Sequence, residues 1–123
     1  MQTVCELHWF RNHAQDAGLT EENIDDLVDY IAQNPMCGVE IAGTGGCRKL
    51  RFALSNKGKR GGARVVTFYT GEDLPVFILT VFAKGERDNL TKAERNDLAV
   101  LTKEIVSEYK NKVVPIRKRR VRK

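Results

Sequence analysis

The clearest helical pattern in the chain lies between residues 20 and 34. Its apolar side chains recur every three or four residues: Ile24, Leu27, Val28 and Ile31. Thr20 stands at the N-cap position, two glutamates follow it, and Pro35 ends the run. This spacing places the apolar side chains on one face, and carboxylates in the first turn suit the helix dipole. We therefore predict an amphipathic helix with an acidic outer face.

Strict alternation marks residues 48–54 as a strand. Leu50, Phe52 and Leu54 share one face of it, whereas Lys49 and Arg51 share the other. Because the apolar face of a half-buried strand turns to the core, the two cations should project from the exposed side of the sheet. The polar, glycine-rich stretch SNKGKRGG that follows is typical of a loop.

Two further β-branched and aromatic runs, residues 63–69 and 76–83, flank the turn sequence TGEDLP. Runs of this kind across a Gly/Asp/Pro turn predict a β-hairpin. Residues 76–83 are almost wholly apolar, which is typical of a central strand that is covered on both faces.

A second amphipathic helix is predicted after Thr91 and Glu94, which form the pattern of a capping box. Its buried stripe would consist of Leu98, Leu101, Ile105 and Tyr109. Residues 8–17 fit either a short helix or an irregular segment, and both stay open. The order of helices, three strands and a helix predicts a small α+β domain, with an antiparallel-rich sheet flanked by helices. We assign residues 1–110 to this domain and 111–123 to a flexible basic tail.

Charge is strongly segregated along the chain, although the formal net charge is only +5. Residues 47–71 contain seven basic residues and no acidic one, and residues 110–123 contain eight basic residues and no acidic one. Residues 1–46 hold eight acidic residues against a single arginine. Cations fixed on a sheet form a rigid positive surface, so we expect a polyanion, in the first place nucleic acid, as the partner.

Several other classes of protein do not fit the sequence. The chain has no apolar run long enough to span a bilayer and no signal-peptide pattern at its N-terminus, so we expect a cytoplasmic protein without membrane contact. The odd, scattered Cys5, Cys37 and Cys47 indicate free thiols instead of disulfides. Metal-ligand and phosphate-loop motifs are absent, and His8 and His13 would not share a helical face. We expect no cofactor and no metal.

Residues 41–96 nevertheless carry one long and specific resemblance. Its marks are the GTGG turn at 43–46, the KLRF strand at 49–52, GARV at 62–65 after a basic loop, and AKGERDNLTKAE at 83–94. In these features the chain resembles the RelE/HigB-type toxins of bacterial toxin–antitoxin modules. The resemblance implies a compact sheet flanked by helices. It also implies an mRNA interferase: a ribosome-dependent endoribonuclease that attacks the RNA phosphate with the adjacent ribose 2′-hydroxyl.

The resemblance also assigns roles to residues of this chain. The basic residues of the KLRF strand, Lys49 and Arg51, lie in the site of the family, with Lys49 as the preferred general base and Arg51 for positioning. Arg64 corresponds to the transition-state contact. Lys84 corresponds to a basic residue that clamps phosphate or protonates the leaving oxygen. Further RNA contacts are expected from Arg48, Lys57, Lys59, Arg60, Phe82 and Arg87.

One departure concerns base stacking. Some family members place a tyrosine shortly after the last basic residue, where this chain has Asn89 and Leu90. Phe82 or Tyr69 could provide a stacking surface instead. The basic tail could grip ribosomal RNA, with a contribution that falls steeply with salt.

Two alternative functions stay open beside the ribonuclease. One is gyrase poisoning by a ParE-like toxin of the same fold, and the other is RNA binding without catalysis. As partners the resemblance implies a cognate antitoxin, which we expect to be a helix-turn-helix protein, besides the ribosome and mRNA. The antitoxin-bound complex could bind operator DNA.

Overall fold

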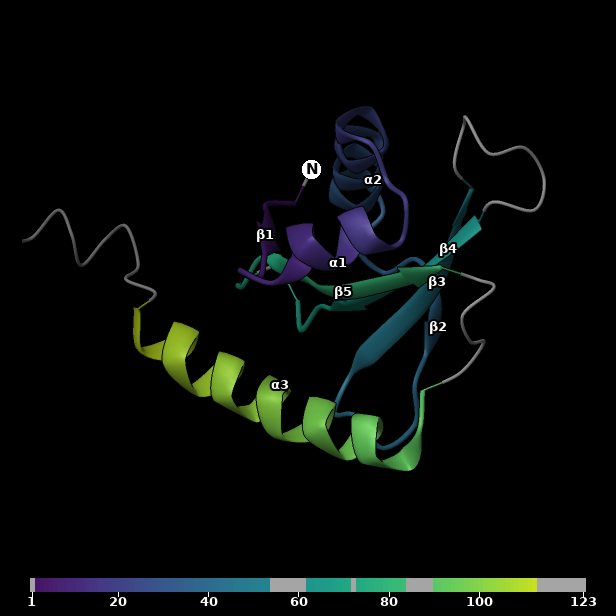
Figure 1. The fold of residues 1–123 in the computed structure, drawn as a ribbon. Coiled ribbons are helices and arrows are strands. Elements are labelled where there is room, and N and C mark those ends of the chain that lie inside the picture. Colours follow the sequence, from purple (N-terminus) through teal and green to yellow (C-terminus); the bar gives the residue numbers. More distant parts are fainter. Residues whose placement is uncertain (1, 54–61, 72, 84–89, 113–123) are drawn as a thin grey trace, which may run out of the picture.

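The computed structural model describes residues 2–53, 62–71, 73–83 and 90–112 (Figure 1). These residues form a five-stranded sheet and three helices. In chain order the elements are β1 (Val4–Glu6), α1 (Phe10–Asp16), α2 (Glu21–Gln33), β2 (Val39–Glu40), β3 (Cys47–Ala53), β4 (Gly62–Phe68), β5 (Val76–Ala83) and α3 (Lys92–Lys112). The predicted α+β class with an antiparallel-rich sheet is confirmed. The open question over residues 8–17 resolves into the short helix α1.

The strand order is β1-β5-β4-β3-β2, and β1 runs parallel to β5 while the other pairs are antiparallel. The sheet is therefore mixed, and its middle strand is β4. The prediction of an interior strand at residues 76–83 is confirmed, because β5 has β1 on one side and β4 on the other. Both faces of β5 are largely buried, as predicted, but its outer edge pairs with β1 only over residues 76–78.

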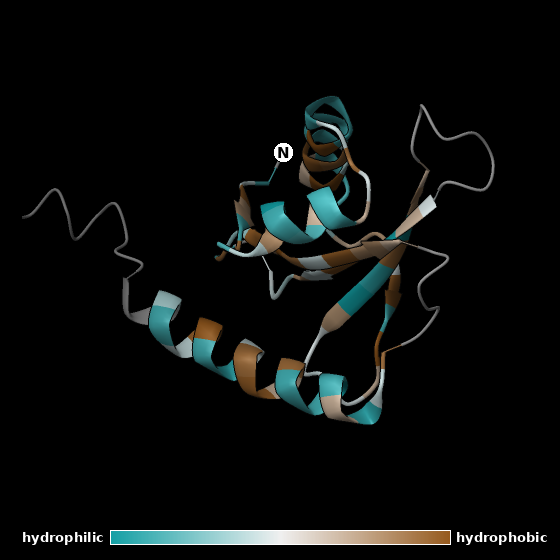
Figure 2. Ribbon diagram, in the orientation of Figure 1, coloured by the Kyte–Doolittle hydropathy of each residue, from teal (hydrophilic) through white to brown (hydrophobic). Residues whose placement is uncertain are grey.

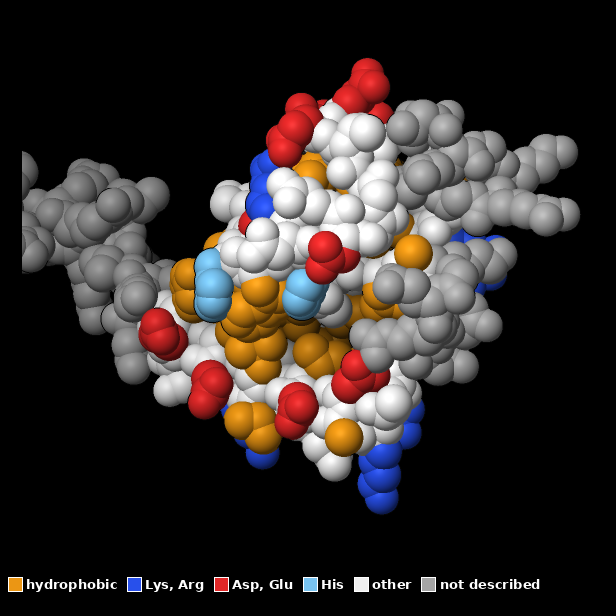
Figure 3. Space-filling model, viewed as in Figure 1, with side chains coloured by type: hydrophobic (Ala, Val, Ile, Leu, Met, Phe, Trp, Pro, Cys, Tyr) orange, Lys and Arg blue, Asp and Glu red, His pale blue; other side chains and the backbone are white. Residues whose placement is uncertain are grey.

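Helices α1 and α2 lie on one face of the sheet and α3 lies on the other (Figure 1). Apolar side chains fill both interfaces. The hydropathy colouring shows apolar residues along the helices and strands that form them (Figure 2). On the face of the molecule seen in Figure 3, hydrophobic side chains gather between α1 and α3. The core beneath α1 and α2 includes Phe10, Ile24 and Leu27 together with Leu50 of β3. Thr20 caps α2 as predicted: its hydroxyl accepts from the backbone N–H of Asn23, and Asn23 Oδ1 accepts from the backbone N–H of Thr20.

The second core lies between the sheet and α3. It contains Phe68 of β4, Phe77 of β5 and Ile105 of α3. The predicted capping box is present, because the Glu94 carboxylate accepts from the Thr91 amide at 2.8 Å and Thr91 Oγ1 accepts from the Glu94 amide at 3.1 Å.

The contacts of α3 fix which part of this face it covers. Thr102 Oγ1 donates to the carbonyl of Thr44, 3.0 Å away, just before β3 begins. A side chain at Gly45 would place its Cβ only 2.9 Å from the same Thr102 hydroxyl, so glycine permits the close approach. From this end, β3 rises away from α3 (Figure 1). Arg51 lies near its distal end.

Candidate nucleic-acid interface

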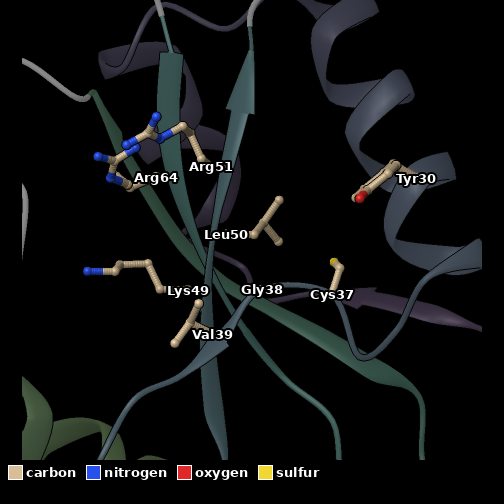
Figure 4. Close-up of a pocket in the computed structure, with 8 residues that line it drawn as sticks. All are labelled: Tyr30, Cys37, Gly38, Val39, Lys49, Leu50, Arg51 and Arg64. Carbon is tan, nitrogen blue, oxygen red and sulfur yellow. The ribbon is translucent and has the colours of Figure 1, made fainter.

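Three basic side chains project together from the α3 side of the sheet. Arg51 of β3 stands directly opposite Arg64 of β4 in the antiparallel register, and Lys49 lies two residues before Arg51 on the same strand. Directly opposed residues of such a pair hold their Cβ atoms about 4.5–5.5 Å apart. Figure 4 shows the three side chains extending to the same side of the strands. We refer to Lys49, Arg51 and Arg64 as the cation cluster.

The cation cluster concentrates positive charge on two neighbouring strands. Like charges that face each other directly across a strand pair repel and destabilise the sheet. Arg64 is only 8% exposed, whereas Arg51 is exposed and Lys49 is half-buried. Arginine keeps its charge when buried. The arrangement therefore offers a fixed positive site that an anion would stabilise.

A hollow of about 440 Å³ opens beside the cluster. Its lining residues are Tyr30, Cys37, Gly38, Val39, Lys49, Leu50, Arg51 and Arg64. We call this space the β2–β3 hollow. None of these described lining residues carries a carboxylate, although α2 beside it is rich in acids. Its electrostatic preference is consequently for negatively charged ligands.

The edge strand β2 is fastened closely to the backbone of Lys49. Val39 pairs with Lys49, and Gly38 before it has a φ of +91°. A Cβ at Gly38 would lie 2.7 Å from the Lys49 carbonyl oxygen. Arg48 supports the same segment, because its Nη1 donates to the carbonyls of Met36 and Gly38, each at 3.1 Å. The packing of this edge thus sets the position of Lys49.

We expect Gly38→Ala to destabilise the fold clearly more than Gly43→Ala. Both glycines have positive φ, +91° and +79°, so either alanine carries the cost of the left-handed region, roughly 1–2 kcal/mol. At Gly38 the new methyl also meets the Lys49 backbone, whereas at Gly43 nothing lies within 4 Å. The free energies of urea-induced unfolding of the two variants give the comparison. Equal losses of unfolding free energy in the two variants would show that β2 can shift away from Lys49 without further destabilisation.

The structure brings together only some of the side chains predicted to form the site. Lys49, Arg51 and Arg64 gather as described. Phe82 stands opposite Arg64 on β5, but its ring is 6% exposed and packs in the α3-side core. Arg48 lies on the opposite face from Lys49 and bonds the segment before β2. The remaining predicted site residues lie outside the described residues: Lys57, Lys59, Arg60, Lys84 and Arg87.

Sequence reasoning missed Tyr30 and Val39. Tyr30 is an aromatic residue on the otherwise acidic outer side of α2, and that exception was the available signal. Val39 belongs to a strand of two residues, which is too short to show alternation. Tyr69, the other candidate for stacking, follows the end of β4 opposite to Arg64, and its hydroxyl accepts from Gln2 Nε2.

Cys37 and Cys47 are protonated thiols, and His13 lies away from the hollow. Burial raises the pKa of Cys37, which lines the hollow, and raises that of Cys47 to about 11, so both thiols stay protonated at neutral pH. His13 Nδ1 lies 2.7 Å from Thr80 Oγ1, outside the lining of the hollow. Among the described residues, no group of three His, Cys, Asp or Glu side chains could hold a metal ion. The charged groups that the site offers to a ligand are therefore the side chains of the cation cluster.

One protein-family profile matches the chain. It is described as the RelE toxin of the RelE/RelB toxin–antitoxin system, and the match extends over residues 2–120. The match therefore includes all eight elements and the cation cluster. Within the described residues, no helix is both long and apolar enough to cross a membrane.

Proposed function

The chain belongs to the RelE toxin family, and from this premise we propose that it is an endoribonuclease that cleaves mRNA on the translating ribosome. Family membership gives the coarser part of this statement: the protein is a toxin of a toxin–antitoxin system, and its partner is a RelB antitoxin. The proposal adds the reaction, the substrate and the residues that act on it.

The proposed reaction is an internal transesterification of RNA. The ribose 2′-oxygen attacks the adjacent phosphorus, the bond to the 5′-oxygen of the next nucleotide breaks, and the products are a 2′,3′-cyclic phosphate and a 5′-hydroxyl. A base must take the 2′-hydroxyl proton, and an acid must protonate the leaving 5′-oxygen. Negative charge builds up on the phosphate oxygens in between, and fixed cations stabilise it.

The cation cluster supplies groups for these tasks. We assign removal of the 2′-hydroxyl proton to Lys49, whose backbone the β2 edge holds in place. Arg64 would contact the phosphate oxygens of the transition state, since a guanidinium can donate two parallel hydrogen bonds to them. Arg51 would position the same phosphate. Lys84, which lies outside the described residues, is the proposed donor to the leaving oxygen.

The observation that carries the proposal is the direct opposition of Arg51 and Arg64, with Lys49 beside them. Two opposed arginines repel each other across the strand pair, and together they can bind the oxygens of a phosphate. Poisoning of gyrase makes no demand on these cations. Simple RNA binding could use them, but loss of any single cation would then weaken binding only gradually.

The antitoxin gives a second reason to consider charge. We propose that RelB presents an acidic or helical segment that covers the cation cluster or displaces an element beside it. A helix-turn-helix antitoxin would also let the complex bind operator DNA. A toxin–antitoxin complex that leaves Lys49, Arg51 and Arg64 open while toxicity is blocked would contradict this mode of neutralisation.

The function is tested by inducing the wild-type protein and mapping new RNA 5′ ends, with translation running and with initiation blocked. We expect new ends inside translated reading frames, carrying a 5′-hydroxyl that must be phosphorylated before ligation, and their loss when initiation is blocked. Growth arrest without new ends would favour the gyrase-type activity. Neither arrest nor new ends would leave RNA binding without catalysis.

A further inference from the structure

The β2–β3 hollow has a second wall that the proposed reaction leaves unused. One side consists of the cation cluster, and the other consists of Tyr30, Val39 and Leu50. In Figure 4, Tyr30 reaches out from α2, and its hydroxyl end points across the hollow toward β3. A flat aromatic ring therefore stands on the far side of the strand from three fixed positive charges.

This wall is more exposed than a structural role requires. Tyr30 is 48% exposed and Val39 is 73% exposed. Among the described residues, the large hydrophobic side chains that are exposed are Tyr30, Met36, Val39 and Val100. Three of these four lie between residues 30 and 39, next to the hollow. Exposed apolar groups that gather at one place indicate a binding surface.

The open edge of β3 connects the two walls. Val39 and Glu40 pair with Lys49 and Arg48, and the described residues provide no outer neighbour for β3 beyond Lys49. An extended ligand can therefore pass over this edge from the cation face to Tyr30. The carboxylates of α2 are not among the residues that line the hollow.

A nucleotide combines the two properties that the hollow offers to a ligand. Its phosphate is anionic and its base is a flat π-surface, and proteins bind single-stranded RNA by pairing cations with aromatic side chains on which bases stack. The volume of about 440 Å³ lies within the range of roughly 300–1,000 Å³ that is typical of small-molecule sites.

We propose that Tyr30, flanked by Val39 and Leu50, forms a subsite for one nucleobase of the RNA whose phosphate the cation cluster binds. The inference rests on the proposed function and adds a contact that holds the strand in register. Tyr30 is a positioning residue that selects where the RNA lies relative to Lys49 and Arg64. It takes no part in bond making or breaking.

The test compares binding of a short single-stranded RNA with binding of the same RNA lacking one base. A 2′-O-methyl group on each ribose blocks the attacking hydroxyl and so prevents cleavage, and fluorescence anisotropy gives the dissociation constants. Stacking on an aromatic side chain corresponds to about 5- to 140-fold in affinity. We expect Tyr30→Ala to weaken binding of intact RNA at least about fivefold, and one abasic position to weaken binding to the wild type by a similar factor. The same abasic RNA should bind the wild type and Tyr30→Ala equally.

Conservative variants separate stacking from packing. Tyr30→Phe keeps a ring and should bind within about twofold of the wild type, whereas Tyr30→Leu should behave like Tyr30→Ala. Val100→Ala removes an exposed apolar side chain of α3 and should leave binding unchanged. Full affinity of Tyr30→Ala, full affinity of Tyr30→Leu, or a wild type that does not distinguish abasic RNA would each overturn the proposal.

A second measurement distinguishes failure of this inference from failure of the proposed function. Mapping 5′ ends in a translation reaction should give a changed distribution of bases at the cut sites for Tyr30→Ala, with cleavage still dependent on Arg64. Arg64-dependent cleavage with an unaltered distribution and unaltered affinity would reject the base subsite alone. Absence of cleavage by the wild type would reject the nuclease. The comparison of intact with abasic RNA would then still show whether Tyr30 binds a base.

Discussion

Arg64→Ala is expected to lower the rate of mRNA cleavage by about 10²–10³-fold, the loss typical for removal of one preorganised donor to a transition-state oxygen. Arg64 is the most buried member of the cation cluster and lies on β4, the middle strand. Burial on a strand restricts the conformations of its side chain, and a restricted donor needs little reorganisation to stabilise a transition state. Single-turnover cleavage of a translated reporter mRNA, followed by quantification of 5′-hydroxyl ends, measures the rate.

Two variants define what the loss means. Arg64→Lys retains the charge but not the planar, two-pronged donor, so it should recover only part of the activity if bidentate contact with phosphate is the function. Arg51→Ala removes a cation from the same cross-strand pair at an exposed position and should cost less. An Arg64→Ala protein that is folded and cleaves within about threefold of the wild type would contradict the assignment. Equal, small losses for every cation would indicate binding without catalysis.

The free energy of unfolding of these variants serves as a control, and the structure also predicts how it should change. Arg64 and Arg51 face each other with like charge, so removing one of them relieves repulsion in the free protein. The lost packing of the Arg64 stem opposes this gain. We therefore do not expect Arg64→Ala to unfold the domain, and the circular dichroism spectrum and the urea midpoint should identify it as folded.

The sequence predicted the elements that have a long, regular pattern. Alternation located β3, the hairpin of β4 and β5 followed from β-branched runs around a turn, and Thr20 and Thr91 marked the starts of two helices. The strands β1 and β2 contain only three and two residues, so they are too short to show an alternating pattern of apolar and polar residues. They form because β5 and β3 have edges with which they can pair, and this depends on the tertiary structure and not on the local sequence. For the same reason the sequence did not show that β1 would pair with β5.

The sequence likewise predicted those parts of the site that depend on a local pattern. Alternation alone placed Lys49 and Arg51 on the face opposite Leu50, as the structure has it. That Arg64 stands opposite Arg51 depends on the register of β3 and β4, which no local pattern specifies. Arg48 was predicted as a further RNA contact, and alternation placed it on the face opposite Lys49, but no local pattern showed that its Nη1 donates to two backbone carbonyls before β2. Tyr30 became a candidate only through the hollow that α2 and β3 share.

Phe77→Ala is expected to lower the free energy of unfolding by about 3–5 kcal/mol, the usual cost of removing a buried phenylalanine side chain. Phe77 is 1% exposed and joins β5 to α3. Its ring centroid lies 5.0 Å from that of Tyr109 in an edge-to-face arrangement and 6.3 Å from that of Phe68. Since small domains are stable by only about 5–15 kcal/mol, the variant should be close to unfolding at 37 °C.

Urea-induced unfolding followed by circular dichroism measures this loss, with two variants as references. Phe77→Leu fills much of the cavity and should lose clearly less, while Val100→Ala on the exposed side of α3 should stay within about 0.5 kcal/mol of the wild type. A loss below about 1.5 kcal/mol for Phe77→Ala would mean that α3 packs on the sheet too loosely to support it. Since the cation cluster lies on β3 and β4 and Phe77 lies on β5, the Phe77→Leu variant should still cleave RNA. The two largest expected effects thus fall on different parts of one sheet: loss of Arg64 removes activity from a folded protein, and loss of Phe77 removes the fold.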